Sequence, residues 1–352
     1  MNKRLLTFLI FLLGCVALAK AQDSVVYRVV LIGDAGEIDK QQQAVLDFAA
    51  NSIIKDKTTV VYLGDNIYPK GMALPGSADT ARTQGILRSE YAPMRAKGAP
   101  VYFIPGNHDW DKMGMHGLEK IKQQWSFLNS QQDSLLRLVP ENGCPDPYEI
   151  NVNDQLTIIA FDSEWWLFPY NKNNPGADCS CTTREDITNR MRELFYKNRG
   201  KVILLASHHP FQSYGLHGGV YSLKDHVFPL TAVNKDLYIP LPIVGSLYPL
   251  LRTVFVNPED MGHPEYKFMI KKIDGIFGDY PNLVHVAGHD HGLQFIKNNK
   301  GQLQVVSVAG AKTVHVKKGK YSPFADAVQG FVTADLMKDK SMRFTYYVYT
   351  DQ

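Results

Sequence analysis

Residues 59–68 read Thr-Val-Val-Tyr-Leu-Gly-Asp-Asn-Ile-Tyr, an apolar run that ends abruptly in glycine and aspartate. The run is rich in β-branched and aromatic residues and is apolar on both faces, which is typical of a strand buried between two layers. Gly64 lets the backbone turn sharply, so that Asp65 stands at the carboxyl end of the predicted strand. In open α/β sheets ligands bind at that end. The stretch therefore predicts a buried strand and a polar site just beyond it.

Four further apolar runs end in the same way, at residues 25–32, 100–104, 202–206 and 283–287. The polar residues that follow them are Gly33-Asp34, Gly106-Asn107-His108, Ser207-His208-His209 and Gly288-His289-Asp290-His291. Residues 156–161 form one more buried run of this type. We therefore expect five strands to bring two aspartates, an asparagine and several histidines to one edge of a sheet.

Helical patterns lie between several of these runs. One helix face is predicted to consist of Val45, Phe48, Ala49 and Ile53. A second helix is predicted to open with the capping box Thr182-x-x-Glu185, to end at Gly200, and to carry Ile187, Met191, Leu194 and Phe195 on one stripe. Residues 331–336 and 342–350 predict a closing hairpin. Alternating strands and helices indicate an α/β sheet covered by helices.

The first 21 residues differ in character from the rest of the chain. Lys3 and Arg4 precede an apolar run, residues 5–19, and Ala19-Lys20-Ala21 closes it with small residues. The run is shorter than the roughly 20 residues of a bilayer span, so it predicts a secretory signal peptide cleaved after Ala21. The mature protein is then expected to be secreted or periplasmic. A form that is lipid-anchored at Cys15 is the alternative.

Residues 22–352 are expected to form one domain without net charge. Removing residues 1–21 removes Lys3, Arg4 and Lys20 and no acid, so the formal charge falls from +3 to 0. A neutral chain without a run of Lys and Arg lacks the electrostatic footprint of a nucleic-acid-binding protein. No transmembrane span is expected in the mature chain.

Three cysteines remain in the mature chain: Cys144, Cys179 and Cys181. In an oxidising compartment one disulfide is expected, between Cys144 and either of the other two. The spacing lacks the paired C-x-x-C pattern of a zinc site, so a structural role is assigned.

Residues 214–281 interrupt the alternation of strands and helices. They are rich in proline, glycine and aromatic residues and include an apolar stretch, residues 239–251, without clear period. We interpret them as an insertion over the carboxyl edge of the sheet that could act as a lid. The apolar stretch is expected to be buried within the insertion rather than to bind a membrane surface, because it is not amphipathic.

The side chains at the strand ends form a set of metal ligands without thiolates. Carboxylates, an amide and imidazoles suit Zn, Fe or Mn. Two cations about 3.5–4 Å apart repel, so a carboxylate must bridge them, and Asp65 is the natural bridge. Such a pair polarises an ester phosphate and activates water near neutral pH.

The ordered motifs GD, GDN, GNHD, SHHP and GHDH resemble those of the calcineurin-like metallophosphoesterase superfamily, over residues of about 27 to 310 with a poor match at 214–281. Within it the chain is similar to the small purple acid phosphatases of the tartrate-resistant type. Asp34-Ala35-Gly36 lacks the histidine usual in the first motif, and Tyr68 stands where purple acid phosphatases carry their tyrosinate ligand. The tyrosine ligand gained at Tyr68 compensates for the histidine ligand lost from the first motif.

The resemblance implies a four-layer αββα sandwich of two mixed sheets, with two metal ions at the carboxyl strand ends. The position for Fe(III) would take Asp34, Asp65, Tyr68 and His291. The position for a divalent Fe, Zn or Mn would take Asp65, Asn107, His208 and His289. Two carboxylates and a phenolate favour a trivalent cation at the first position.

The resemblance also implies that His108 and His217 are catalytic residues which face the substrate, and that the protein is a monomer. The expected reaction is hydrolysis of phosphate monoesters by a metal-bound hydroxide, as in acid phosphatases, with small phosphate esters as substrates. The alternative is a Zn- or Mn-dependent phosphodiesterase or nucleotide hydrolase of the same superfamily. A third hypothesis is a non-catalytic protein that binds metal or phosphate.

Other polar and aromatic residues near the motifs are given structural roles. His209 is expected to point away from the metals, because neighbouring side chains on an extended segment face opposite ways. Asp109 and Asp290 are expected to orient histidines. Trp110 is expected in the wall of the pocket, whereas Trp165 and Trp166 are assigned to packing.

Overall fold

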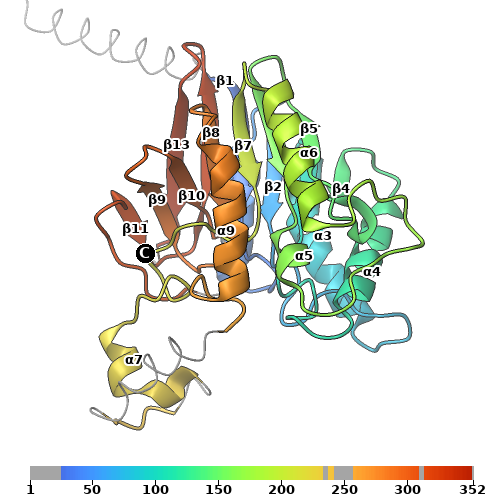
Figure 1. The fold of residues 1–352 in the computed structure, drawn as a ribbon. Coiled ribbons are helices and arrows are strands. Elements are labelled where there is room, and N and C mark those ends of the chain that lie inside the picture. Colours follow the sequence, from blue (N-terminus) through green and yellow to red (C-terminus); the bar gives the residue numbers. More distant parts are fainter. Residues whose placement is uncertain (1–24, 233–236, 242–256, 309–312, 351–352) are drawn as a thin grey trace, which may run out of the picture.

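The computed structural model describes residues 25–232, 237–241, 257–308 and 313–350. The predicted signal peptide, the alternative anchor at Cys15 and most of the apolar stretch 239–251 lie outside these residues. The described part consists of two sheets packed face to face, with helices on their outer faces (Figure 1). The α/β class and the four-layer arrangement of two mixed sheets are confirmed.

The first sheet has six strands, and their order follows the chain except at one edge. In spatial order they are β13 (Met342–Val348), β12 (Gly330–Met337), β1 (Val25–Ile32), β2 (Thr58–Leu63), β3 (Val101–Ile104) and β4 (Leu136–Leu138). Strands β1 to β4 are parallel, while β12 and β13 form the predicted closing hairpin and pair antiparallel. The parallel strands therefore end at one edge.

The second sheet has seven strands. In spatial order they are β11 (Phe324–Asp326), β9 (Leu293–Lys297), β10 (Leu303–Val306), β8 (Leu283–Ala287), β7 (Val202–Ala206), β6 (Leu156–Ala160) and β5 (Tyr148–Asn151). Strands β6, β7, β8 and β10 are parallel, and the remaining pairs are antiparallel. The two sheets together carry the six predicted apolar strands, each within one residue of its predicted bounds, and the predicted hairpin, whose second strand ends two residues earlier than predicted.

Helices cover both outer faces. Those on the first sheet are α2 (Lys40–Asn51), α3 (Thr80–Ala96) and α4 (Gly117–Asn129). Those on the second sheet are α5 (Ser163–Leu167), α6 (Arg184–Lys197) and α9 (Pro264–Phe277). A short helix, α7 (Leu223–Val227), projects from the body of the fold (Figure 1). No helix among the described residues has the length and apolar character that crossing a membrane requires.

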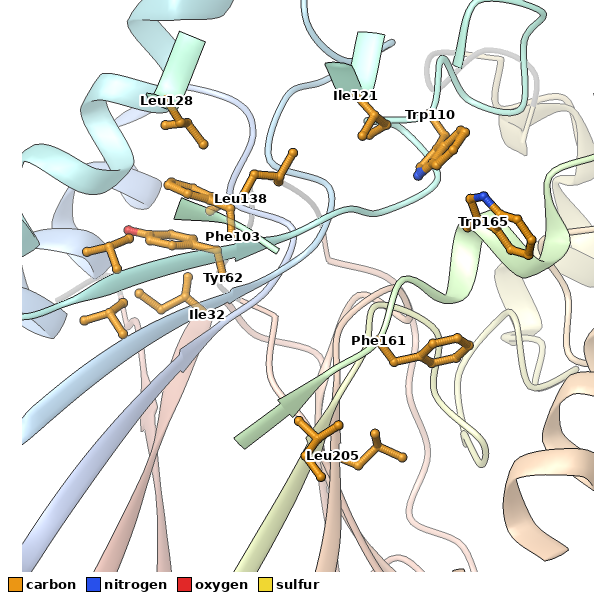
Figure 2. Packing of buried hydrophobic residues seen from close by; sticks show 14 of the residues in the cluster. Ile32, Tyr62, Phe103, Trp110, Ile121, Leu128, Leu138, Phe161, Trp165 and Leu205 are labelled. Atoms are coloured by element: carbon orange, nitrogen blue, oxygen red, sulfur yellow. The ribbon is translucent and has the colours of Figure 1, made fainter. Parts of the chain in front are cut away.

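Strands that are apolar on both faces divide the core into two layers. Val30 and Tyr62 face the helices, whereas Val29 and Val61 join the cluster between the sheets. Figure 2 shows Tyr62 beside Phe103 on the helix side, with ring centroids 4.6 Å apart. This explains why the runs lack the alternation of half-exposed strands.

Two helix predictions need correction. The capping box of α6 consists of Thr183 and Asp186, one residue later than predicted, because Thr182 and Thr183 are each followed three residues later by an acid. Such a cap stabilises a helix by about 1 kcal/mol. In α2, Val45 and Ala49 are buried as predicted, but Phe48 is 54% exposed and Ile53 lies beyond the helix end.

Helix α9 occupies the crossover between β7 and β8. The final part of the predicted insertion therefore belongs to the regular strand–helix–strand alternation. The described residues 214–232, 237–241 and 257–263 stand outside this alternation and are hereafter called the insertion segment. The disulfide joins Cys144 to Cys179, and the thiol of Cys181 is free and buried.

Candidate metal centre

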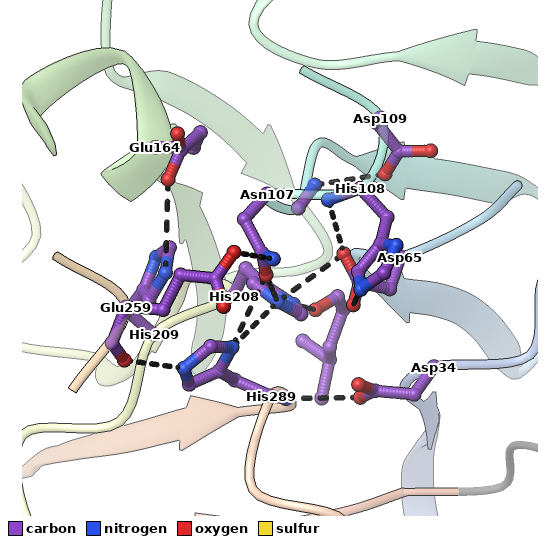
Figure 3. A network of polar contacts seen from close by, with 12 residues as sticks. Asp34, Asp65, Asn107, His108, Asp109, Glu164, His208, His209, Glu259 and His289 are labelled. Atoms are coloured by element: carbon purple, nitrogen blue, oxygen red, sulfur yellow. Dashed lines mark hydrogen bonds and ion pairs between the residues drawn. The ribbon is translucent and has the colours of Figure 1, made fainter. Parts of the chain in front are cut away.

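The predicted ligands meet at the carboxyl ends of parallel strands from both sheets. Asp34 follows β1, Asp65 follows β2, and Asn107 comes shortly after β3. His208 follows β7, and His289 and His291 follow β8. All except His291 are buried, and Figure 3 shows several of them directed toward one another.

Tight turns make this convergence possible. Asp34, Asp65 and His289 have φ angles of 56°, 55° and 70°, in the left-handed region that non-glycine residues rarely adopt. Strain of this kind clusters at functional sites. At Gly64, φ is 91° and a Cβ atom would collide with the ring of His208, so only glycine fits between β2 and that imidazole.

One half of the centre is built around the phenol of Tyr68. Its hydroxyl lies 3.2 Å from Asp34 Oδ1, 3.1 Å from Asp65 Oδ2 and 3.4 Å from His291 Nε2. Asp34 Oδ1 is also 3.3 Å from His291 Nε2. Burial raises the pKa of Tyr68 well above its ordinary value, and the negative charges of Asp65 and Asp34 raise it further. The protonated phenol therefore donates to the carboxylates when no cation is bound.

The other half is built from imidazoles and an amide. His208 Nε2 lies 2.9 Å from Asn107 Oδ1 and 3.2 Å from His289 Nδ1, which is itself 3.2 Å from Asn107 Oδ1. His208 Nδ1 donates to the Leu63 carbonyl at 2.8 Å, and His289 Nε2 donates to the Glu259 carbonyl at 2.8 Å. Those two bonds fix the tautomers, because a carbonyl only accepts.

The tautomers leave three acceptors pointing at one another. In the neutral forms, His208 Nε2 and His289 Nδ1 each present a lone pair, and Asn107 presents its oxygen because its Nδ2 donates to Glu259 Oε1 at 3.0 Å. Lone pairs that converge without a donor repel unless a cation or an added proton sits among them. The donor set therefore fits a metal ion, held by Asn107, His208 and His289.

Asp65 stands between the two halves. Its Oδ2 accepts from Tyr68, while its Oδ1 lies 3.4 Å from His208 Nε2. Burial by itself would raise the pKa of this carboxyl, but His208 and His108 lower it to about 2. An ionised carboxylate with one oxygen toward each half suits the predicted bridge.

The two predicted substrate-side histidines lie at different sides of the centre. His108 Nδ1 is 2.6 Å from the Pro69 carbonyl, its Nε2 is 3.9 Å from Asp65 Oδ2, and its ring packs edge-on against Tyr68. His217 belongs to the insertion segment. Its ring centroid is 4.0 Å from that of His289, and its Nδ1 lies 2.8 Å from Asp260 Oδ1. The structure thus brings all nine predicted site residues together.

His209 packs against the ring of His289, while both of its ring nitrogens face residues outside the predicted ligand set. Its ring centroid lies 4.5 Å from that of His289, and its Nδ1 is 2.8 Å from Ser163 Oγ. The chain bends directly after β7, so the alternation of an extended strand does not apply there. Behind it, Glu164 is fully buried, 3.7 Å from His209 Nε2, and burial raises the pKa of its carboxyl well above the ordinary value.

Three further expectations need correction. Asp109 orients loops rather than histidines, because its carboxylate accepts from the backbone N–H groups of Asn66 and Gly106. Asp290 accepts from the hydroxyl of Ser213. Trp110 is completely buried and donates to Asp162 Oδ2 at 3.0 Å, so it belongs to the core rather than to a pocket wall.

Sequence reasoning missed Glu259. It lies in a loop of the insertion segment without a motif around it, yet it contacts two ligands of the centre. Polar residues such as Lys224 and Asp225 occur elsewhere in the insertion segment as well, so no signal in the sequence singled out Glu259.

Comparison with known proteins identifies relatives of this fold. A family model described as calcineurin-like phosphoesterase matches residues 27–293. No curated protein matches the chain in sequence.

Three solved structures are similar to the chain. The first is GAP50, the anchor in the inner membrane complex of Plasmodium, with 14% identity and a TM-score of 0.53; the match covers 93% of this chain and 90% of that one. The second is PhoD, with 12% identity and a TM-score of 0.51; the match covers 91% of this chain and 68% of that one. The third is a dimetal phosphatase from Danio rerio, with 14% identity and a TM-score of 0.48; the match covers 93% of this chain and 100% of that one. At such low identities the likeness to GAP50 and PhoD shows the fold alone.

Proposed function

The chain belongs to the calcineurin-like phosphoesterase family, and from that premise we propose that it hydrolyses phosphate monoesters at a centre of Fe(III) and one divalent cation. The divalent cation would be Fe, Zn or Mn. This is the composition of the purple acid phosphatases, which the motifs of the chain resemble.

The position of the Tyr68 hydroxyl carries the proposal. It lies within 3.4 Å of Asp34, Asp65 and His291, the three side chains that would share a cation with it. As a phenolate, Tyr68 would bring the negative charge around that cation to three. A hard trivalent ion matches this set better than Zn or Mn does.

The other half supports a divalent ion. Asn107, His208 and His289 are neutral ligands, and Asp65 alone adds a negative charge there. Bound cations would supply a Lewis acid for the phosphate oxygens and a water molecule of lowered pKa. The residues that would hold both cations lie on turns at the ends of rigid strands, so little rearrangement would be required when a phosphate binds.

His108 would interact with the phosphate or with the leaving group of the substrate. Its Nδ1 donates to the Pro69 carbonyl, so a second proton on Nε2 makes the ring an imidazolium. An imidazolium beside Asp65 can neutralise a phosphate oxygen or protonate the departing alkoxide.

We also propose that the mature protein is exported. The apolar segment 5–19 with its basic start supports a signal peptide. The Cys144–Cys179 disulfide supports the same conclusion, because disulfides persist in oxidising compartments.

The visible absorption spectrum tests whether the protein binds Fe(III) through Tyr68. Mildly oxidised, fully loaded protein should show a purple or pink charge-transfer band, because tyrosinate bound to Fe(III) absorbs visible light. Tyr68→Phe should be colourless at the same iron content. A colourless wild-type protein with two bound cations would instead indicate a Zn or Mn phosphoesterase in which Tyr68 only packs.

Rates on matched substrates test the monoesterase assignment. A series of aryl phosphate monoesters should be hydrolysed faster than the corresponding diesters. The reverse order would favour the phosphodiesterase or nucleotide hydrolase. Absence of turnover on both series, with two cations bound, would favour a non-catalytic metal-binding protein.

A further inference from the structure

One short stretch of the insertion segment reaches into the candidate metal centre. Glu259 and Asp260 are 9% and 6% exposed, although they lie in a loop just before α9. Asn257 holds this loop in shape, because its side-chain oxygen accepts from the Glu259 N–H and its carbonyl accepts from the Asp260 N–H. The stretch is therefore a built turn whose two acids are directed inward.

The carboxylate of Glu259 sets the orientation of Asn107. An asparagine amide can rotate by 180° and exchange its oxygen and nitrogen at little cost. Here Nδ2 donates to Glu259 Oε1 at 3.0 Å, so Oδ1 faces His208 and His289. The flipped amide would oppose its oxygen to a carboxylate and turn its N–H groups toward the metal position. Glu259 thus selects the rotamer that binds a cation.

The backbone carbonyl of Glu259 fixes the tautomer and the ring plane of His289. The Glu259 carbonyl accepts from His289 Nε2 at 2.8 Å, which leaves Nδ1 as the nitrogen that faces His208 and Asn107. A partner of this kind fixes both the tautomer and the ring plane of a metal-binding histidine. Glu259 therefore contacts two of the four residues assigned to the divalent position.

Asp260, the next residue, contacts His217, one of the two histidines predicted to face the substrate. Asp260 Oδ1 lies 2.8 Å from His217 Nδ1, and the Met261 N–H donates to the His217 carbonyl at 3.0 Å. The His217 ring stacks against His289 with centroids 4.0 Å apart. Consecutive residues thus position a metal ligand pair and the histidine that lies against it.

We propose that Glu259 is a positioning residue for the divalent half of the centre, so that the loop of residues 257–261 sets the affinity of that half for its cation. The proposal rests on the proposed function only in taking Asn107, His208 and His289 as metal ligands. Both contacts of Glu259 fall on that half, so the half built on Tyr68 is expected to keep its affinity when Glu259 is replaced.

Two substitutions separate the hydrogen bond from the charge. In Glu259→Ala, Asn107 loses its acceptor, and we expect affinity for the second Zn²⁺ to fall about 10- to 100-fold, as for other lost partners of metal ligands. In Glu259→Gln, the amide oxygen still accepts from Asn107, so the affinity should stay near that of the wild type. Glu265→Ala removes a carboxylate that pairs with Arg184 at the start of α9 and serves as the matched control.

The experiment is a calorimetric titration of Zn²⁺ into metal-depleted full-length mature protein, with the melting temperature of each variant measured in parallel. Weakening of one zinc site in Glu259→Ala alone, at an unchanged melting temperature of the metal-free protein, supports the proposal. Two unchanged sites in Glu259→Ala would overturn it, as would equal weakening in Glu259→Gln. Wild-type protein loaded with Fe(III) and one divalent cation that hydrolyses no phosphate ester would refute the proposed function and leave this inference standing.

Discussion

The two halves of the candidate centre differ in what holds their ligands in place. Around Tyr68 the ligands contact one another: the phenol donates to the carboxylates of Asp34 and Asp65. Around Asn107 the side of each ligand that faces away from the centre is bound elsewhere. His208 donates to the Leu63 carbonyl, and Asn107 donates to Glu259.

This difference indicates how each half responds when its cation is removed. The half built on Asn107 has its tautomers and rotamers fixed from outside, so its shape is retained. The half built on Tyr68 closes on itself through bonds that a cation must replace, and the phenol must lose a proton. We therefore expect the first to be preorganised and the second to couple metal binding to proton release.

Replacing Asp65 should have the largest effect, because it is the residue that the two halves share. In Asp65→Asn the negative charge between the cations is lost, and the remaining ligands do not offset their repulsion. Both cations should bind weakly, and monoester hydrolysis should fall to background, beyond the ~10²–10⁴-fold that loss of a general acid costs. Metal content and steady-state rates measure this. Asp47→Asn, on the exposed face of α2, is the control.

Retention of one tightly bound cation in Asp65→Asn would change the comparison. It would mean that the halves are independent sites, and that Asp65 belongs to only one of them.

Replacing His108 should lower turnover while leaving both halves intact. His108→Ala removes the imidazole that would protonate the leaving group, so kcat should drop by roughly 10²–10⁴-fold. The backbone N–H of residue 108 still donates to Asp65 Oδ1, so metal content and colour should not change. His116→Ala, an exposed histidine that pairs with Glu119, is the control. Unchanged hydrolysis would remove His108 from the mechanism, and lost metal would make it a structural support.

The strands could be predicted from the sequence where the chain itself carries a clear pattern. Strands such as β2 and β7 were predicted to within a residue because both of their faces are buried, so they form apolar runs with clear ends. Strands β4, β5, β9, β10 and β11 were missed, because each has only three to five residues and includes a polar residue, so that none forms a continuous apolar run. The register of the α6 cap was missed because two adjacent threonines offer equivalent boxes.

The ligands could be predicted because they follow directly in sequence from buried strands. Asp65 and His208 occupy the first turns beyond β2 and β7, where topology alone brings them together. Glu259 could not be predicted, because its contact with Asn107 joins a loop to a strand end 152 positions away. The turn that directs it inward depends on tertiary packing, which leaves no periodic signal in the chain.

The number of protons released when a cation binds is the smallest expected effect, and it tests the half built on Tyr68 selectively. Burial and the charges of Asp65 and Asp34 raise the pKa of Tyr68 well above its ordinary value, so the metal-free phenol keeps its proton from about pH 5 to 9. Binding of Fe(III) as a phenolate complex must release that proton, which makes iron affinity rise about tenfold per pH unit more steeply than it would without Tyr68. Tyr68→Phe should therefore release one proton fewer per iron at any pH in this range. Calorimetry in two buffers of different ionisation enthalpy measures the count, and Zn²⁺ bound at the other half should release the same number in both proteins. Equal counts for iron would mean that Tyr68 stays protonated, and the contrast between the halves would then rest on their hydrogen bonds alone.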